Sequence, residues 1–294
     1  MVKHGTLAFF VLAAPLVVGS CATQHADAPA AATPTPPATA NAAASPDTEA
    51  KLRSVLAMPH RSEANRHRDQ YRHPVETLSF FGIREDMNVV ELWPGGGWYT
   101  EVLAPLLKDK GHLAVTNTVK GTKYADMLKA KPDVFGKVEQ RIIDPPKTLD
   151  FGPEGSADLV VTFRNIHGWR SDDKPYDDKV YAAVYKVLKS GGTFGVEEHR
   201  AKPGADPAEL KDTGYVSEDW VIKRVQEAGF RFVGKSEVNA NPKDTKDWPY
   251  GVWTLPPTLR VKDEDKAKYE ANKDKDKYLA VGESDRMTLK FVKP

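Results

Sequence analysis

Residues 89–103 constrain the fold of this chain more than any other segment. They read VVELWPGGGWYTEVL: a short apolar run ends at Pro94 and three glycines, and apolar residues then recur at helical spacing through Leu107. A strand cannot continue through the glycines, so the segment predicts a strand, a glycine turn and a helix. Pro105 should kink or shorten that helix.

Strand-like and helix-like segments alternate through the whole of residues 48–294. We expect seven strands, at residues 87–93, 112–116, 138–143, 157–163, 193–198, 230–238 and 286–292. Besides the helix after the glycine turn, we expect helices at residues 52–57, 63–81, 176–188 and 216–228. This order predicts an α/β fold: a doubly wound, mainly parallel seven-stranded sheet with helices on both faces and ligands at the carboxyl ends of its strands.

Composition narrows the classes of function. The 294 residues include 42 Lys+Arg and 41 Asp+Glu, and 40% are hydrophobic, which is enough for a sizeable core. A net charge of +1 argues against nucleic-acid binding, because that role usually leaves a strong basic excess. The single Cys excludes internal disulfides and zinc sites with several thiolates. The eight His lack paired ligand spacing, so we predict no metal site.

The N-terminal residues have the layout of an export signal. Lys3 precedes an uninterrupted apolar stretch from Leu7 to Val18, which is too short to span a bilayer as a mature helix. The segment ends in Val-Gly-Ser-Cys and resembles the bacterial lipoprotein cleavage box. We therefore expect residues 1–20 to be a signal peptide and Cys21 to carry lipid. An ordinary signal peptide that contains a Cys is the alternative.

The lipid would hold the protein at the cell envelope, on the periplasmic side. Ala22 follows the Cys, which favours the outer membrane over the inner one. Residues 22–47 are rich in Ala, Pro and Thr and show no apolar periodicity, so residues 21–47 should form the anchor and a disordered linker. Residues 48–294 then form one domain.

Several motifs of this domain resemble class I S-adenosylmethionine-dependent methyltransferases. They are Glu91 before the glycine turn, the Leu-Lys-Ser-Gly-Gly helix stop at residues 188–192, and the final alternating strand. The resemblance covers residues 60–294 and is closest to a group of exported bacterial methyltransferases, which share TFRNIHGW (residues 162–169) and GESDRMTLKFVKP (residues 282–294). It implies a Rossmann-like methyltransferase fold and S-adenosyl-L-methionine as cofactor.

The resemblance also assigns cofactor residues around the glycine turn. Glu91 matches the acidic residue that opens the first motif. The glycines that would lie beneath the methionine part of the cofactor are Gly95, Gly96 and Gly97. Trp93 replaces the usual first glycine and Pro94 stiffens the turn, so we expect a narrowed pocket.

Two further cofactor positions follow the next strands. Asn117 takes the place of the acidic residue that would hold the ribose hydroxyls, and its amide gives up a charge-assisted acceptor. Asp144 matches the position that meets the adenine amino group. Asp144-Pro-Pro is similar to the motif of DNA adenine methyltransferases, but that motif belongs after the fourth strand. We therefore reject that activity.

The methyl acceptor should approach the residues after the fourth strand, where Arg164, Asn165 and His167 lie. Methyl transfer needs positioning above all, and a base only if the nucleophile loses a proton. His167 is the candidate base, and a structural hydrogen bond to a loop is the alternative. A second candidate group ends the fifth strand: Glu197, Glu198 and His199, for which a helix cap or a salt bridge is the alternative.

Two segments flank this site. The first, which we name the basic segment, is residues 60–73, with His60, Arg61, Arg66, His67, Arg68, Arg72 and His73. Some of these could pair with the cofactor carboxylate or an acidic acceptor, but we expect a solvated helix face for most. The second is an insertion at residues 239–284, whose Trp248, Tyr250 and Trp253 could cover the site or grip a partner.

Two functions fit these features. The first is an exported, lipid-anchored methyltransferase, monomeric, acting on a small-molecule or envelope-associated acceptor. The alternative is a non-catalytic binding module of the envelope. Trp93 and Asn117 favour the alternative, as does the cytoplasmic origin of S-adenosylmethionine, whereas Glu91 and the three glycines favour the enzyme. A hydrolase is disfavoured because no Ser or Cys nucleophile lies in an elbow-like motif.

Overall fold

The computed structural model describes residues 1–2, 43–118, 122–170, 175–206, 209–261, 266 and 274–294. Cys21, nearly all of the predicted signal peptide and most of the predicted linker lie outside them. The chain divides into two units, Met1–Pro36 and Pro37–Pro294, and the elements below all belong to the second. Its first helix, α1 (Pro46–Leu56), begins six residues before the expected position, because Ser45 caps it and Pro46 suits the first helical turn.

A seven-stranded sheet forms the centre of this unit. Its strands are β1 (Asn88–Leu92), β2 (His112–Thr118), β3 (Glu139–Ile143), β4 (Ala157–Phe163), β5 (Leu188–His199), β6 (Arg231–Ser236) and β7 (Arg286–Val292). They lie in the order β3-β2-β1-β4-β5-β7-β6. All neighbours pair in parallel except β7, which is antiparallel to both β5 and β6. The predicted doubly wound α/β fold is therefore confirmed.

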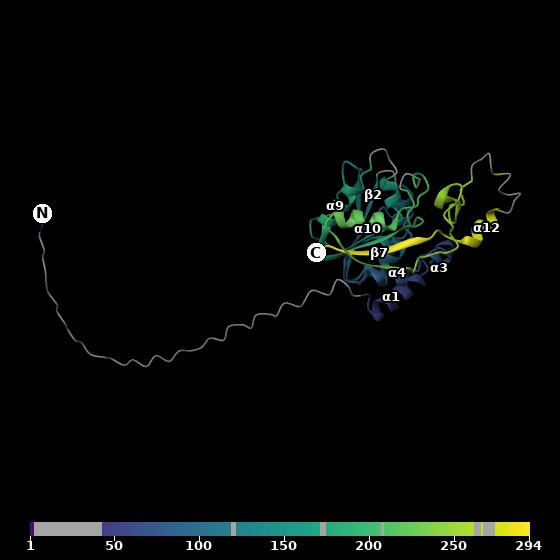
Figure 1. Cartoon of the computed structure of the whole chain (residues 1–294). Helices are drawn as coiled ribbons and strands as arrows, with labels where there is room; N and C mark the ends of the chain where they lie inside the picture. Colours follow the sequence, from purple (N-terminus) through teal and green to yellow (C-terminus); the bar gives the residue numbers. More distant parts are fainter. Residues whose placement is uncertain (3–42, 119–121, 171–174, 207–208, 262–265, 267–273) are drawn as a thin grey trace. The chain divides into compact units, whose positions relative to one another are not determined.

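Helices cover both faces of the sheet (Figure 1). One face packs against α1, α4 (Pro74–Phe81), α5 (Thr100–Leu107), α6 (Thr122–Ala130) and α7 (Pro132–Phe135). The other packs against α8 (Ile166–Arg170), α9 (Asp177–Val187) and α10 (Glu218–Glu227). Neighbouring strand residues divide between two cores: Val89 joins the first and Val90 the second. The strand order reverses between β1 and β4, which is where open α/β sheets bind ligands.

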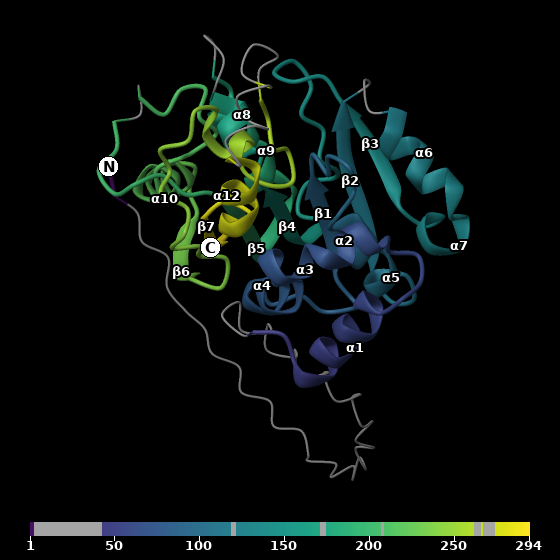
Figure 2. The ribbon, with the colours of Figure 1, turned by 90° about the vertical axis from the view of Figure 1, so that its right-hand side faces the viewer.

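The predicted helix at residues 63–81 is wrong in its continuity. The chain forms α2 (Glu63–His67), α3 (Asp69–Arg72) and then α4. His73 between α3 and α4 has a left-handed backbone, with φ 39°. Pro74 explains the break, because a proline disfavours helical backbone at the residue before it. Figure 2 shows these short helices on the same side of the sheet as α5.

The alternating strand β7 is buried along its whole length. Its polar residues Arg286, Thr288 and Lys290 are at most 2% exposed. The Asn239 amide accounts for part of this, since its Nδ2 donates to Thr288 Oγ1 at 2.9 Å and to Thr77 Oγ1 of α4 at 2.8 Å. The polar face of β7, which in an alternating strand usually faces solvent, thus faces the helices next to the basic segment.

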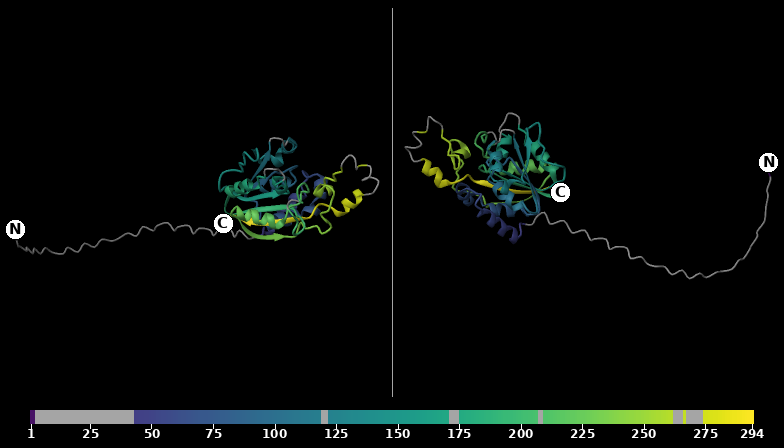
Figure 3. Two further views of the ribbon diagram at one scale, coloured as in Figure 1. Left: turned by 45° about the horizontal axis from the view of Figure 1, so that its top comes forward. Right: turned by 180° about the vertical axis from the view of Figure 1, so that it is seen from behind.

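The insertion contains a 3-10 turn, η1 (Gly251–Thr254), and α12 (Asp274–Val281). Figures 1 and 3 place α12 beside the start of β7, at the opposite end of that strand from the C-terminus. The charged run at residues 262–277 lies mostly outside the described residues. Among the described residues, none of the helices has the length and apolar character needed to cross a bilayer.

Candidate functional site

The glycine turn leaves bare main chain at the carboxyl end of β1. Gly95 and Gly97 have φ values of 59° and 81°, which favour glycine. A Cβ at Gly95 or Gly96 would meet no heavy atom within 4 Å, whereas one at Gly97 would lie 2.6 Å from Met127 Cε. Gly97 is therefore favoured by its left-handed backbone and packs against the end of the Met127 side chain, whereas the backbone at the other two glycines is open.

Trp93, at the position of the usual first glycine, is held by aromatic packing. Its backbone N–H donates to Thr116 O at 3.1 Å, which anchors the turn to β2. Its ring centroid lies 5.2 Å from that of Trp169 and 5.9 Å from that of Phe151. The indole thus joins the core on the α8 side of the sheet.

Glu91 is a buried carboxyl group in the strand that leads into the turn. Its Oε2 accepts a hydrogen bond from Thr100 Oγ1 at 2.5 Å, and it is 1% exposed. Burial raises the pKa of Glu91 to about 7, although the Thr100 hydrogen bond and the Arg164 charge act in the opposite direction. A cation bound close to Glu91 would favour its ionised form.

The two other predicted cofactor residues end neighbouring strands. Asn117 lies at the carboxyl end of β2, where its Oδ1 accepts the N–H of Thr118 at 2.9 Å. Asp144 follows β3, and its side chain is 65% exposed and 3.5 Å from Lys147 Nζ. Both lie at the same edge of the sheet as the glycine turn, because these strands are parallel.

Arg164 and Asn165 point to different parts of the sheet. The Asn165 Nδ2 donates to Leu92 O and to Thr162 Oγ1, both at 3.0 Å, and so ties the end of β1 to the end of β4. Arg164 has a left-handed backbone, with φ 61°, and its Nη1 donates to Glu197 Oε1 at 3.1 Å. Asn165 thus has a structural role in this arrangement, whereas Arg164 reaches towards the end of β5.

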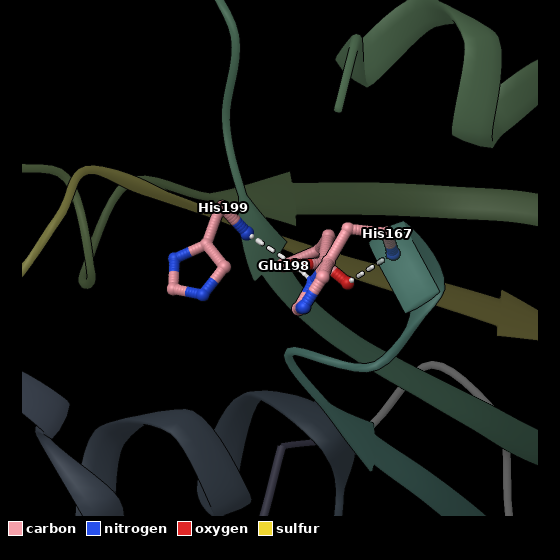
Figure 4. A group of neighbouring side chains, drawn as sticks. All are labelled: His167, Glu198 and His199. Carbon is pink, nitrogen blue, oxygen red and sulfur yellow. Dashed lines mark hydrogen bonds and ion pairs between the residues drawn. The ribbon is translucent and has the colours of Figure 1, made fainter. Parts of the chain in front are cut away.

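Glu198 orients His167 (Figure 4). Its buried carboxylate accepts the N–H groups of Ile166 at 2.6 Å, His167 at 3.3 Å and His199 at 2.8 Å. Its Oε1 also lies 3.1 Å from His167 Nδ1, which leaves the Nε2 atom for a ligand. The helix-cap interpretation of this residue therefore holds, and the contact with Nδ1 fixes the imidazole.

His199 completes this group. Its Nδ1 lies 2.6 Å from Ser284 Oγ, and its ring centroid is 5.4 Å from that of His167. Burial, the neighbouring His167 and three arginines hold the pKa of His199 well below its usual value, so this imidazole is neutral.

One donor atom from each of His167, Glu198 and His199 lies within 4.8 Å of the others, a grouping that could hold a metal ion. The sequence analysis named these residues as acceptor-site candidates but predicted no metal site, because ligand spacing does not reveal that the pairing of β4 with β5 brings together residues about thirty positions apart. The Glu198 oxygens are already engaged by N–H groups, and the arginines that act on His199 would repel a dication. The arrangement suits an oriented base better than a metal ligand set.

Glu197 faces the opposite side of β5 and enters a different network. Its Oε1 accepts hydrogen bonds from Arg164 Nη1 and Arg286 Nη1, each at 3.1 Å, and its Oε2 accepts one from Tyr99 Oη at 2.8 Å. Burial opposes the charge, but the arginines outweigh it and lower the pKa of Glu197. The carboxylate is thus ionised and fully engaged.

A cavity of about 230 Å³ opens between these residues, and its wall includes Arg72, Arg164, His167, His199, Trp253 and Glu283. The Trp253 ring centroid lies 5.9 Å from that of His167, so the insertion lines this cavity. Trp248 instead packs against Tyr278 of α12.

The expectation that most of the basic segment would form a solvated helix face is wrong, because two of its seven basic side chains, Arg66 and His67, are exposed, two are half-buried and three are buried. His60, Arg61 and Arg72 are at most 6% exposed. His60 Nε2 lies 2.7 Å from Glu101 O, and Arg61 makes a two-pronged ion pair with Asp69 at 2.7 and 2.8 Å. These bonds hold the side chains that the broken helix turns inward, although His60 Nδ1, Arg61 Nε and Arg72 Nη1 have no hydrogen-bond partner within the described residues.

No protein-family model and no curated protein sequence matches the chain. Solved structures do match. A SAM-dependent methyltransferase from Aquifex aeolicus is 19% identical with a TM-score of 0.46, over 65% of this chain and 93% of that one. The cyclase SpnF is 16% identical with a TM-score of 0.49, over 84% and 93%. An arsenic(III) S-adenosylmethionine methyltransferase from Chlamydomonas reinhardtii is 14% identical with a TM-score of 0.46, over 83% and 73%.

Proposed function

We propose that this protein is an S-adenosylmethionine-dependent methyltransferase, exported and held at the cell envelope by lipid on Cys21. The main observation that supports a methyltransferase is the open main chain at Gly95 and Gly96. These glycines lie at the carboxyl end of β1, where the strand order reverses. An oriented imidazole, His167, lies after the neighbouring strand β4. The open main chain of the turn and the candidate base therefore share one edge of the sheet.

The residues at this edge fit the cofactor. Bare backbone at Gly95 and Gly96 allows close approach of its methionine part, and the Asn117 amide can hydrogen-bond ribose hydroxyls. The cofactor carries positive charge, and the Glu91 carboxylate, which is 1% exposed, would stabilise that charge through space and not by direct contact. When bound, S-adenosylmethionine supplies a methyl group on a sulfonium, which is transferred to a nucleophile.

The chain contributes positioning and a proton acceptor. His167 Nε2 can take the proton of a hydroxyl or amine nucleophile, since Nδ1 is directed at Glu198. The Glu198 carboxylate then stabilises the imidazolium that forms. For a carboxylate nucleophile no proton is lost, and His167 would serve only to position the acceptor.

Calorimetric titration with S-adenosylhomocysteine and S-adenosylmethionine tests the cofactor site. Gly96→Arg fills the open space over the turn, and we expect it to abolish binding. Gly234→Arg is the matched control and should bind like the wild type. A Cβ at Gly234 also meets no heavy atom within 4 Å, but Gly234 lies in the edge strand β6, away from the glycine turn. No heat with either compound would contradict the enzyme and favour the binding module, which Trp93 in the glycine position would then explain.

The location of the protein is supported by sequence alone. The apolar stretch from Leu7 to Val18 and the small pair before Cys21 favour lipidation and attachment, with the outer membrane as the expected site. Cys21→Ser should release the protein from membranes or stall its maturation. If this variant fractionates like the wild type, the anchor proposal fails.

A further inference from the structure

Four guanidinium groups meet in the wall of the cavity and behind it. They belong to Arg68, Arg72, Arg164 and Arg286, and among the described residues two carboxylates pair with them: Glu197 and Glu283. Glu283 accepts from Arg68 Nε at 2.6 Å, from Arg72 Nε at 3.1 Å and from Arg286 Nη2 at 2.5 Å. The group keeps an excess of two positive charges, or of one if Glu198 is included.

Arg72 and Arg286 each have an unmet donor among the described residues, Arg286 at Nε, and of these two residues the cavity is lined by Arg72. Arg72 is 3% exposed, and its Nη1 has no hydrogen-bond partner within the described part of the chain. Its guanidinium lies over the Trp98 ring, 4.7 Å from the centroid. Burial and the nearby Arg164 charge hold the pKa of Arg72 well below its usual value. A buried cation with an unmet donor is costly unless a ligand completes its shell.

The residues around Arg72 determine the charge that such a ligand must carry. Arg72 and Arg164 form one wall of the cavity, and Trp253 of the insertion forms another. An anion would meet guanidinium donors in a partly enclosed space, where charge-assisted hydrogen bonds are strong. A cation, or a neutral molecule, would leave the positive excess uncompensated.

We propose that this cavity binds the methyl acceptor through an anionic group, a carboxylate or a phosphate, held by Arg72 and Arg164. Arg164 donates one N–H to Glu197, and a guanidinium has five, so donors remain for a ligand. Trp253 packs against the apolar part of the acceptor, and His167 lies beside its nucleophile. The identification of the ligand as the methyl acceptor rests on the proposed function, whereas the binding of an anion in this cavity does not.

Titration calorimetry with the full chain, at constant ionic strength, tests this inference with two probes: inorganic phosphate and succinate. We expect at least one of them to bind, and Arg72→Gln to weaken that binding at least tenfold. Arg53→Gln is the matched control, because the Arg53 side chain is 61% exposed on α1. It should bind the probe like the wild type. Putrescine, a cationic probe, should give no heat.

Folding of each variant is checked by its unfolding midpoint. If Arg72→Gln does not fold, Arg164→Gln replaces it, since this side chain is 18% exposed. The inference is overturned if neither anion binds the wild type. It is also overturned if the anion that binds has the same affinity for Arg72→Gln, or for Arg164→Gln where that variant replaces it, as for the wild type. A parallel titration with S-adenosylhomocysteine separates the two proposals. If S-adenosylhomocysteine binds and neither anion does, only the anion-site proposal is refuted. If an anion binds and S-adenosylhomocysteine does not, only the methyltransferase proposal is refuted.

Discussion

Glu198 Oε1 lies 3.1 Å from Nδ1 of His167, and the same carboxylate accepts three backbone N–H groups around it. The acceptor is fixed, so the hydrogen atom of the neutral imidazole belongs on Nδ1. Nitrogen NMR of labelled protein should therefore find the Nδ1–H tautomer of His167. Finding the Nε2–H tautomer would remove the free lone pair that a base requires.

Glu91 gives a prediction about pH. Its pKa is about 7 when folded and near the ordinary 4.5 when unfolded. Between these values the folded protein keeps the proton and the unfolded chain loses it, so the contribution of Glu91 to stability is greatest below pH 4.5 and falls as pH rises towards 7. Glu91→Gln should remove this loss, worth about 3 kcal/mol at most.

Urea unfolding of wild type and Glu91→Gln at pH 4.5 and pH 8 measures this effect. The variant should gain stability relative to the wild type between the two pH values. Thr100→Val removes the hydrogen bond that lowers the Glu91 pKa. With Glu91 retained, this variant should lose more unfolding free energy between pH 4.5 and pH 8 than the wild type does. Equal pH dependence in all three proteins would contradict the assignment.

The glycine turn predicts unequal costs at neighbouring positions. Gly97→Ala places a Cβ 2.6 Å from Met127 Cε at a left-handed backbone, and we expect it to cost about 1–3 kcal/mol of unfolding free energy. Gly96→Ala meets open space at an ordinary φ and should stay within about 0.5 kcal/mol. Thermal unfolding compares them, and similar losses would show that the turn is not built as described.

Asp244 should hold the insertion over the cavity. Its buried carboxylate accepts from Tyr215 Oη at 2.8 Å, Trp248 Nε1 at 2.7 Å and the Asp285 N–H at 2.8 Å. Asp244→Ala leaves these donors unsatisfied and should cost roughly 2–4 kcal/mol. It should also raise acrylamide quenching of tryptophan fluorescence as Trp253 becomes exposed.

The control for this change is Asp247→Ala, which removes an exposed carboxylate paired with Lys202. Such a surface pair contributes less than about 1 kcal/mol, so stability and quenching should match the wild type. If Asp244→Ala behaves like this control, the insertion is not anchored through Asp244.

The sheet could be predicted because each strand carries its own signal. Residues 157–163 and 286–292 match β4 and β7 in full, since continuous hydrophobicity and strict alternation are local patterns. The helix α8 was not predicted, because five residues containing Gly168 show no helical period. The break at His73 depends on Pro74, a breaker that the apolar spacing of residues 63–81 concealed.

The site was predictable in its positions and less so in its contacts. The carboxyl ends of parallel strands gather Glu91, Asn117 and His167 at one edge without further information. The pairing of His167 with Glu198 depends on the register of β4 with β5, which single residues do not encode. The burial of Arg72 likewise depends on how a broken helix turns its side chains.

A crystal structure of the protein with S-adenosylhomocysteine tests the central claim most directly. We expect the ligand at the carboxyl ends of β1 and β2, with its methionine part over Gly95 and Gly96 and its sulfur facing the cavity beside His167. A structure in which the Trp93 indole occupies that space, or the ligand lies elsewhere, would contradict it.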